Sequence, residues 1–152
     1  MLPQFRKYVL VNSSGQTLTY DNNGRINLKE TCWIVDPTTG KITYTQLADD
    51  DLGFGAGESI ANAAELIGDT EIVNTSNLYI GSQLQLEITH DEGAAAAGTF
   101  ELYMAVGDAT GELDTDASGY LSAAYGLRLV GQLIWNSSAT DDEVIRSKIF
   151  SI

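Results

Sequence analysis

Strict alternation of apolar and polar residues is the feature of this sequence that most limits its fold. In QLQLEIT, residues 83–89, the leucines and the isoleucine point to one side of an extended chain, and the polar residues between them point to the other. The same period of two recurs in TFELYMAV, residues 99–106, and in LRLVGQLIW, residues 127–135. Gly131 interrupts the last run, which indicates a bulge or a close backbone approach. The pattern predicts half-buried strands.

Shorter β-prone runs fill much of the remaining chain. They are RKYVLVN, QTLTY, RINLK, TCWIVD, KITYTQL and EVIRSKIFSI, and the turn-forming stretches SSG, DNNG and PTTG separate several of them. Gly24 after Asn23 is the strongest hairpin signal. About eight to ten short strands with regular turn signals predict an all-β fold, an antiparallel β-sandwich or jelly roll. We expect residues 1–152 to form a single domain.

One segment departs from the period of two. In ESIANAAELIG, residues 58–68, the spacing of Ile60, Ala63, Ala64 and Ile67 is helical, and the final glycine stands where a helix would stop. The spacing predicts one short helix in this segment.

Two glycine-rich stretches are interpreted as connections. Residues 48–57, ADDDLGFGAG, contain three successive aspartates but lack the lysine and spacing of a phosphate-binding loop, and their charge would repel phosphate. Residues 91–98, DEGAAAAG, are too short for a stable isolated helix, so we expect a long hairpin loop there.

The charge of the chain limits its partners. Eight Lys and Arg residues against 21 Asp and Glu residues give a formal net charge of −13. Such a chain repels a phosphate backbone, so we expect no nucleic acid as partner. No apolar run approaches the roughly 18 residues of a membrane span, and no signal-peptide pattern opens the chain. We therefore expect a soluble protein without a leader and without a membrane partner.

The stretch DTDASG, residues 114–119, is the best match to a metal site. Asp114, Asp116 and Ser118 have the spacing of calcium ligands in an EF-hand loop, but the twelfth position is Tyr125, where a bidentate glutamate is required. We interpret the stretch as an acidic connection between strands, with a weak surface cation site as the alternative. One cysteine and one histidine exclude paired Cys/His zinc spacing, so we expect no metal and no cofactor.

Catalytic residues in a familiar arrangement are missing from the sequence. His90 follows a strand-like run beside acidic residues, where solvated turn histidines are common, and Cys32 lies in a β-prone run that favours a buried, inert thiol. The many acidic residues fall mainly in predicted loops, although a pair of carboxylates facing each other across a cleft stays open as an alternative. For Trp33 and Trp135 we expect core packing rather than stacking on a sugar. We expect no enzymatic activity.

Four features of the sequence occur together: the opening MLPQFRKYVLVN, the Thr/Ser/Asn/Gly-rich pattern of NSSGQTLTYDNNGRINL, the Ala/Gly-rich connections and the strand-like end SKIFSI. In these features the sequence as a whole resembles small virion structural proteins of tailed bacteriophages, particularly head decoration or auxiliary proteins. It implies a non-enzymatic capsid decoration protein in the virion, bound to the outside of the head and in contact with the major capsid protein. The acidic charge agrees with an outer rather than a DNA-facing location.

A virion protein of this kind would be a homo-oligomer, and we expect its two terminal segments to dock on neighbouring subunits. The first segment is basic and aromatic and the second is apolar. The residues expected to make these contacts are Phe5, Arg6, Lys7, Tyr8, Ile149, Phe150 and Ile152. The alternative is that both segments are ordinary edge strands of one sandwich.

Three other functions stay open. A tail or neck component of the virion would have the same sequence character. A tail or fibre domain would recognise a host glycan through one of several aromatic residues, with calcium at Asp114 and Asp116. The residues considered for glycan contact are Tyr103, Tyr120, Tyr125 and Trp135. An enzyme is the third alternative.

Overall fold

A computed structural model of the chain shows an all-β protein. It describes residues 1–13, 15, 26–47, 60, 63–68, 71–76, 78–90, 98–107, 113, 127–135 and 144–152. The strands are β1 (Phe5–Asn12), β2 (Ile26–Val35), β3 (Ile42–Leu47), β4 (Glu65–Ile67), β5 (Ile72–Val73), β6 (Gly81–His90), β7 (Gly98–Gly107), β8 (Arg128–Trp135) and β9 (Val144–Ser151).

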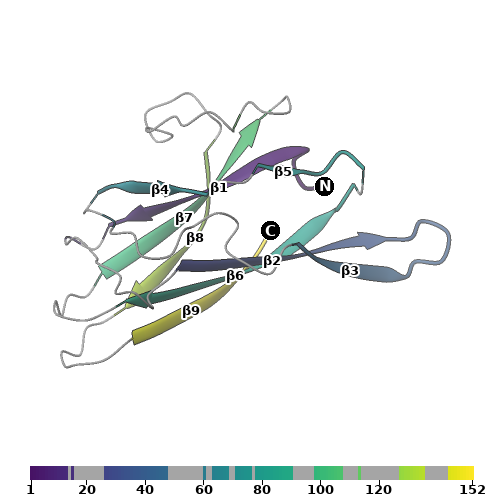
Figure 1. The fold of residues 1–152 in the computed structure, drawn as a ribbon. Helices are drawn as coiled ribbons and strands as arrows, with labels where there is room; N and C mark the ends of the chain where they lie inside the picture. Colours follow the sequence, from purple (N-terminus) through teal and green to yellow (C-terminus); the bar gives the residue numbers. More distant parts are fainter. Residues whose placement is uncertain are drawn as a thin grey trace.

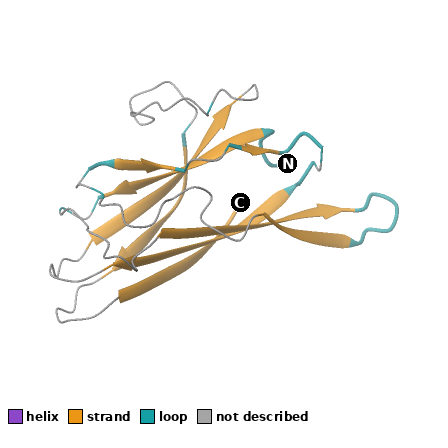
Figure 2. Cartoon of the chain, viewed as in Figure 1, coloured by secondary structure: helices purple, strands orange, loops and turns teal. Residues whose placement is uncertain are grey.

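The strands form two antiparallel sheets. One sheet has the order β4-β1-β7-β8, with β5 also paired to β1, and the other has the order β3-β2-β6-β9. The sheets face each other as two layers (Figure 1), and strands account for all the regular structure in the described residues (Figure 2). The predicted antiparallel β-sandwich is therefore confirmed.

The core lies between the two layers and follows the alternation read from the sequence. Leu84 and Leu86 of β6 face Phe100 and Leu102 of β7 across this interior, and all four side chains are fully buried. Leu10 of β1 belongs to the same cluster. Burial of each such side chain stabilises the fold by about 1.5–3 kcal/mol, which explains why this part of the pattern is so regular.

Strand β1 departs from the half-buried pattern because it is covered on both faces. Its side chains at alternate positions point into the sandwich, while Val9 and Val11 pack on the outside of the sheet against Ala105 and Leu113. All eight residues of β1 are buried. This strand is therefore central to the five-stranded sheet, between β4 and β7, and is not an edge.

The expected short helix over residues 58–68 is wrong where the structure describes this segment. Glu65–Ile67 form β4, and Val9 pairs with Ile67. Ala63 has a φ of 60°, outside the helical region, and its N–H donates to the carbonyl of Asn12 at 2.7 Å. A segment this short gains little as an isolated helix, so backbone pairing with β1 decides its structure.

Within the described residues no helix has the length and hydropathy to cross a membrane.

Two local features predicted from glycine are confirmed. Between β7 and β8, Leu102 pairs with Gly131 but Tyr103 pairs with Leu129, which is the irregularity expected at Gly131. Between β2 and β3, Gly40 has a φ of +69° and closes the PTTG turn by donating to the Asp36 carbonyl at 2.8 Å.

Both ends of the chain are held by contacts within the sandwich. The N–H of Leu2 donates to the carbonyl of Tyr79 at 3.1 Å. The side chain of Asn74 is buried, accepts from the N–H of Tyr79 at 2.8 Å and donates to the carbonyls of Leu2 and Tyr79. At the other end, Ile152 and Ser82 exchange two backbone hydrogen bonds. No neighbouring subunit is needed to account for the position of either end.

Candidate functional site

The first candidate is a polar cluster buried between the sheets, formed by Arg6, Tyr8, Glu30 and Cys32. Nη2 of Arg6 donates to Oε2 of Glu30 at 2.9 Å, and the hydroxyl of Tyr8 donates to Oε1 of the same carboxylate at 2.9 Å. Arg6 and Tyr8 come from β1 and the other two from β2, so the cluster joins the two layers. All four side chains are at most 1% exposed.

Burial sets the electrostatics of this cluster. It raises the pKa of Cys32 from 9.0 to about 12, with Glu30 as the next cause. Burial also raises the pKa of Tyr8 well above its ordinary value, again assisted by the carboxylate. Burial is the largest influence on Arg6 and by itself would lower its pKa, but the charges and hydrogen bonds of Glu30 and Tyr8 together outweigh it, so the pKa of Arg6 is raised. At neutral pH Cys32 is a protonated thiol, which is the unreactive form.

The cluster therefore has the residue types of a catalytic site but not the access. Nε and Nη1 of Arg6 are buried without a hydrogen-bond partner in the described structure. None of the four side chains lines either of the two hollows described below. Its chemistry is that of a structural ion pair, in which one acidic group compensates a cation that folding removes from water.

The second candidate is the outer face of the four-stranded sheet, which we call the polar face. Strand pairing brings its side chains into cross-strand rows. The middle row runs from Gln46 through Thr31 and Gln83 to Ser151, across all four strands. The side chains that line hollows on this face are Lys29, Thr31, Trp33, Tyr44, Gln46, Gln83, Gln85 and Ser151.

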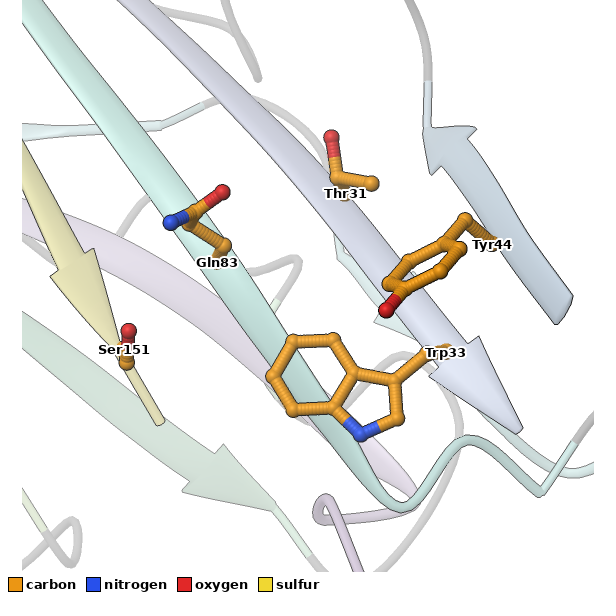
Figure 3. A pocket seen from close by; sticks show the side chains of 5 residues that line it. All are labelled: Thr31, Trp33, Tyr44, Gln83 and Ser151. Carbon is orange, nitrogen blue, oxygen red and sulfur yellow. The ribbon is translucent and has the colours of Figure 1, made fainter. Parts of the chain in front are cut away.

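Trp33 lies on this outer face, so the expectation that it packs in the core is wrong. Its neighbours across the sheet are Tyr44 on β3 and Gly81 on β6. A Cβ atom placed on Gly81 would lie 2.8 Å from Cε2 of Trp33, which shows that the indole rests directly on the glycine backbone. Figure 3 shows the indole reaching from β2 over β6 with the ring of Tyr44 beside it. The two ring centroids are 6.4 Å apart and the planes are tilted by 57°.

Two hollows adjoin along the polar face. One, of about 220 Å³, is lined by Thr31, Trp33, Tyr44, Gln83 and Ser151 (Figure 3). The other, of about 270 Å³, is lined by Lys29, Thr31, Gln46, Gln83 and Gln85. Thr31 and Gln83 line both, so the two hollows are adjacent, and we call them together the groove. Its lining contains hydroxyls, amides, two aromatic rings and a single ammonium group, and no carboxylate.

The third candidate is the tip of the β2–β3 hairpin, residues 35–46, which we call the hairpin arm. It extends beyond the other strands (Figure 1), and every residue in it is exposed. Val35 and Ile42 are cross-strand partners and are 40% and 48% exposed. Tyr44 follows on the same face and is 64% exposed. Among the described strands, β3 pairs with β2 alone, so it is an edge strand.

The residues expected to contact neighbouring subunits lie mostly inside the chain. The side chains of Phe5, Arg6, Lys7 and Tyr8 are buried, and Nζ of Lys7 donates to the carbonyl of Leu113 at 3.0 Å. At the other end, β9 is an edge of its sheet, and Ile152 is partly buried against the core. The side chains of Ile149 and Phe150 lie outside the described set. The alternative of ordinary edge strands thus fits β9 and is wrong for β1.

Other sequence predictions fall on different parts of the molecule. Tyr103 lies on the five-stranded sheet, away from the polar face, and donates to Oε2 of Glu101 at 2.9 Å. The calcium-like stretch at residues 114–119, Tyr120, Tyr125 and the side chains of His90 and Trp135 lie outside what the structure describes. No group of three or more His, Cys, Asp or Glu side chains in the described residues is arranged to hold a metal.

The sequence did not reveal the polar face because the alternation of residues in β2 does not show which side of the strand is buried. Glu30 and Cys32 point inward, whereas Trp33 points outward. An inward carboxylate and an outward indole reverse the usual rule of apolar residues inside. The available signal was Gly81, since a glycine at the start of a strand indicates close approach of another group.

Comparison with known proteins adds no identification. No protein-family model, no curated protein and no solved structure matches this chain.

Proposed function

We propose that this chain is a non-enzymatic structural subunit of a bacteriophage virion, a decoration protein on the outside of the head. In this proposal it associates with copies of itself and with the major capsid protein. The observation that carries the proposal is the hairpin arm, which presents an apolar cross-strand pair and an edge strand to solvent.

The hairpin arm has the properties of a docking element. Edge strands offer unpaired N–H and C=O groups to another chain, and soluble proteins usually protect them with charge, proline or a covering loop. In β3 the sequence is ITYTQL, which contains no charge and no proline. The exposed pair of Val35 and Ile42 adds apolar area that association would bury. These features support insertion of the arm against a neighbouring subunit by strand addition.

The charge of the chain supports an outer location. A net charge of −13 repels packaged nucleic acid and keeps a surface protein hydrated. A shell-lining position would instead require a basic surface facing the phosphates.

The proposal is tested by measuring copy number in virions purified from the source of the sequence. Quantitative mass spectrometry would compare this chain with the most abundant shell protein. A copy number equal to the shell protein, or a simple fraction of it, supports a decoration protein on the lattice. A far smaller copy number would indicate that the chain belongs to the tail or neck instead of the head. Absence of the chain from the particles would overturn the virion proposal.

A second candidate function is glycan recognition by a tail or fibre component. The polar face favours it, with residues other than those considered from the sequence. That site is independent of where in a virion the chain resides, and it is argued separately below.

A further inference from the structure

We infer that the polar face binds a neutral oligosaccharide, with Trp33 and Tyr44 as the stacking platform and Thr31 and Gln83 as the central hydrogen-bonding residues. This inference does not rest on the virion proposal, but Tyr44 also belongs to the hairpin arm, so a subunit docked over that residue would compete with the sugar. It rests on the order of side chains along the groove, on the support beneath Trp33 and on the charge of the lining.

The aromatic end of the groove holds the ring of Trp33 against the sheet and leaves the ring of Tyr44 exposed. The indole of Trp33 rests on Gly81, where any larger residue would force it away from the sheet. Tyr44 flanks the indole at 6.4 Å and is 64% exposed. The C–H faces of a pyranose ring are apolar and flat, so an exposed aromatic ring held by the backbone can cover one of them while the hydroxyls point outward.

The floor of the groove supplies partners for those hydroxyls. Thr31, Gln83 and Ser151 lie in one cross-strand row next to the aromatic pair, and Gln85 lies in the following row. Hydroxyl and amide groups both donate and accept hydrogen bonds, which matches the sugar hydroxyl, also a donor and an acceptor. With neighbouring strands about 4.8 Å apart, the row offers such groups at regular steps across the sheet.

The arrangement is different from that of a protein interface. Protein interfaces place apolar residues in a buried centre and polar residues at the rim. Here the amides and hydroxyls line the hollows, and the aromatic pair stands at one end.

The charge of the site selects neutral sugars. Lys29 is the single charged residue in the lining of the two hollows, and it lies at the end opposite to the aromatic pair. The net charge of −13 disfavours acidic polysaccharides at long range. The groove spans several rows, so it would hold a chain of several sugar units better than one.

The test is a titration of the whole chain with neutral hexasaccharides of the glucan, xylan and mannan types, followed by protein NMR and by calorimetry. We expect one type to shift the indole N–H signal of Trp33 and the side-chain amide signals of Gln83. The Trp33→Ala and Tyr44→Ala variants should each lower the affinity about tenfold or more. Gln83→Ala should also weaken binding, while Tyr103→Phe, on the other sheet, should leave it unchanged.

Several outcomes would overturn the inference. They are absence of binding by all three hexasaccharides, binding that survives Trp33→Ala and Tyr44→Ala in folded variants, or signal changes confined to the five-stranded sheet. Preference for an acidic hexasaccharide of galacturonic acid would overturn the neutral assignment. Folding of each variant is checked by its NMR spectrum, so a lost affinity is separated from a lost fold.

Discussion

Nη2 of Arg6 and Oε2 of Glu30 are 2.9 Å apart in the buried interior, although their strands belong to different sheets. Both side chains are 0% exposed. Tyr8 donates to the second oxygen of the carboxylate, and Cys32 lies within 3.5 Å of the guanidinium. Such a pair is costly to break, because either partner alone would be left as an uncompensated charge.

We therefore expect Glu30→Gln to destabilise the fold by about 3–5 kcal/mol, measured by urea unfolding. Replacing Arg6, Tyr8 and Glu30 together with Met, Phe and Leu should recover most of that loss, since no buried polar group is then left unpaired. A loss below about 1 kcal/mol in the single variant would show that the guanidinium finds another partner.

The buried thiol of Cys32 predicts a loss of stability at high pH. Its pKa is raised from 9.0 to about 12 in the folded chain, so above pH 9 the unfolded chain releases a proton that the folded chain keeps. This favours the unfolded state as pH rises, by up to about 1.4 kcal/mol per pH unit, and the effect is absent below pH 9.

The check is to compare the free energy of unfolding between pH 8 and pH 10.5 for the natural chain and Cys32→Ala. The natural chain should lose stability more steeply. Tyr8, whose pKa is also raised, acts in the same direction in both proteins and cancels in the comparison. Equal slopes would contradict the prediction, as would fast reaction of the thiol with a disulfide reagent in the folded protein at pH 8.

The contact of Trp33 with Gly81 predicts a coupling between the two positions. In Gly81→Ala the new methyl group displaces the indole, and we expect a loss of about 1–3 kcal/mol in unfolding free energy. In a Trp33→Ala background the same substitution should cost clearly less, and the difference between the two backgrounds measures the contact. Independent, additive effects would show that the indole does not rest on residue 81 in solution.

The hairpin arm predicts self-association. We expect the chain to form oligomers in analytical ultracentrifugation, and Ile42→Asp to shift the distribution toward the monomer, because it places a charge in the apolar cross-strand pair. Thr43→Asp provides the matched control, since it adds the same charge on the other face of β3. Equal effects of both variants would indicate that net charge, rather than the apolar face, controls association.

The hydrogen bonds of the Asn74 side chain predict that this residue holds the amino-terminal segment in place. Asn74→Ala removes the bonds to Leu2 and Tyr79 and should cost about 1–3 kcal/mol, since it leaves buried backbone groups unpaired. Faster hydrogen exchange at the Tyr79 amide is the direct measurement. The exposed neighbour Thr75 serves as the control, because Thr75→Ala should leave that exchange rate unchanged.

Local pattern was enough to predict the class of fold and much of its core. The alternation in residues 83–89 and 99–106 identified two strands and the leucines that they bury, because a period of two belongs to strands alone. Gly40 marked a turn, because the backbone there has a positive φ that favours a residue without a side chain. Gly131 marked a bulge, because the pairing register of β7 and β8 shifts next to it.

The tertiary structure alone decided which faces are covered and which strands are neighbours. Periodicity separates the two faces of a strand but does not say what lies against each of them. For this reason β1, which resembled an exposed terminal strand, is central and buried, Glu65–Ile67 pair with it instead of forming a helix, and Trp33 points outward. The partner of Arg6 is 24 residues away on the opposite sheet, and only the packing of the two layers brings that carboxylate to it. Such contacts depend on the free energy of the whole assembly of strands, which no local window of the sequence contains.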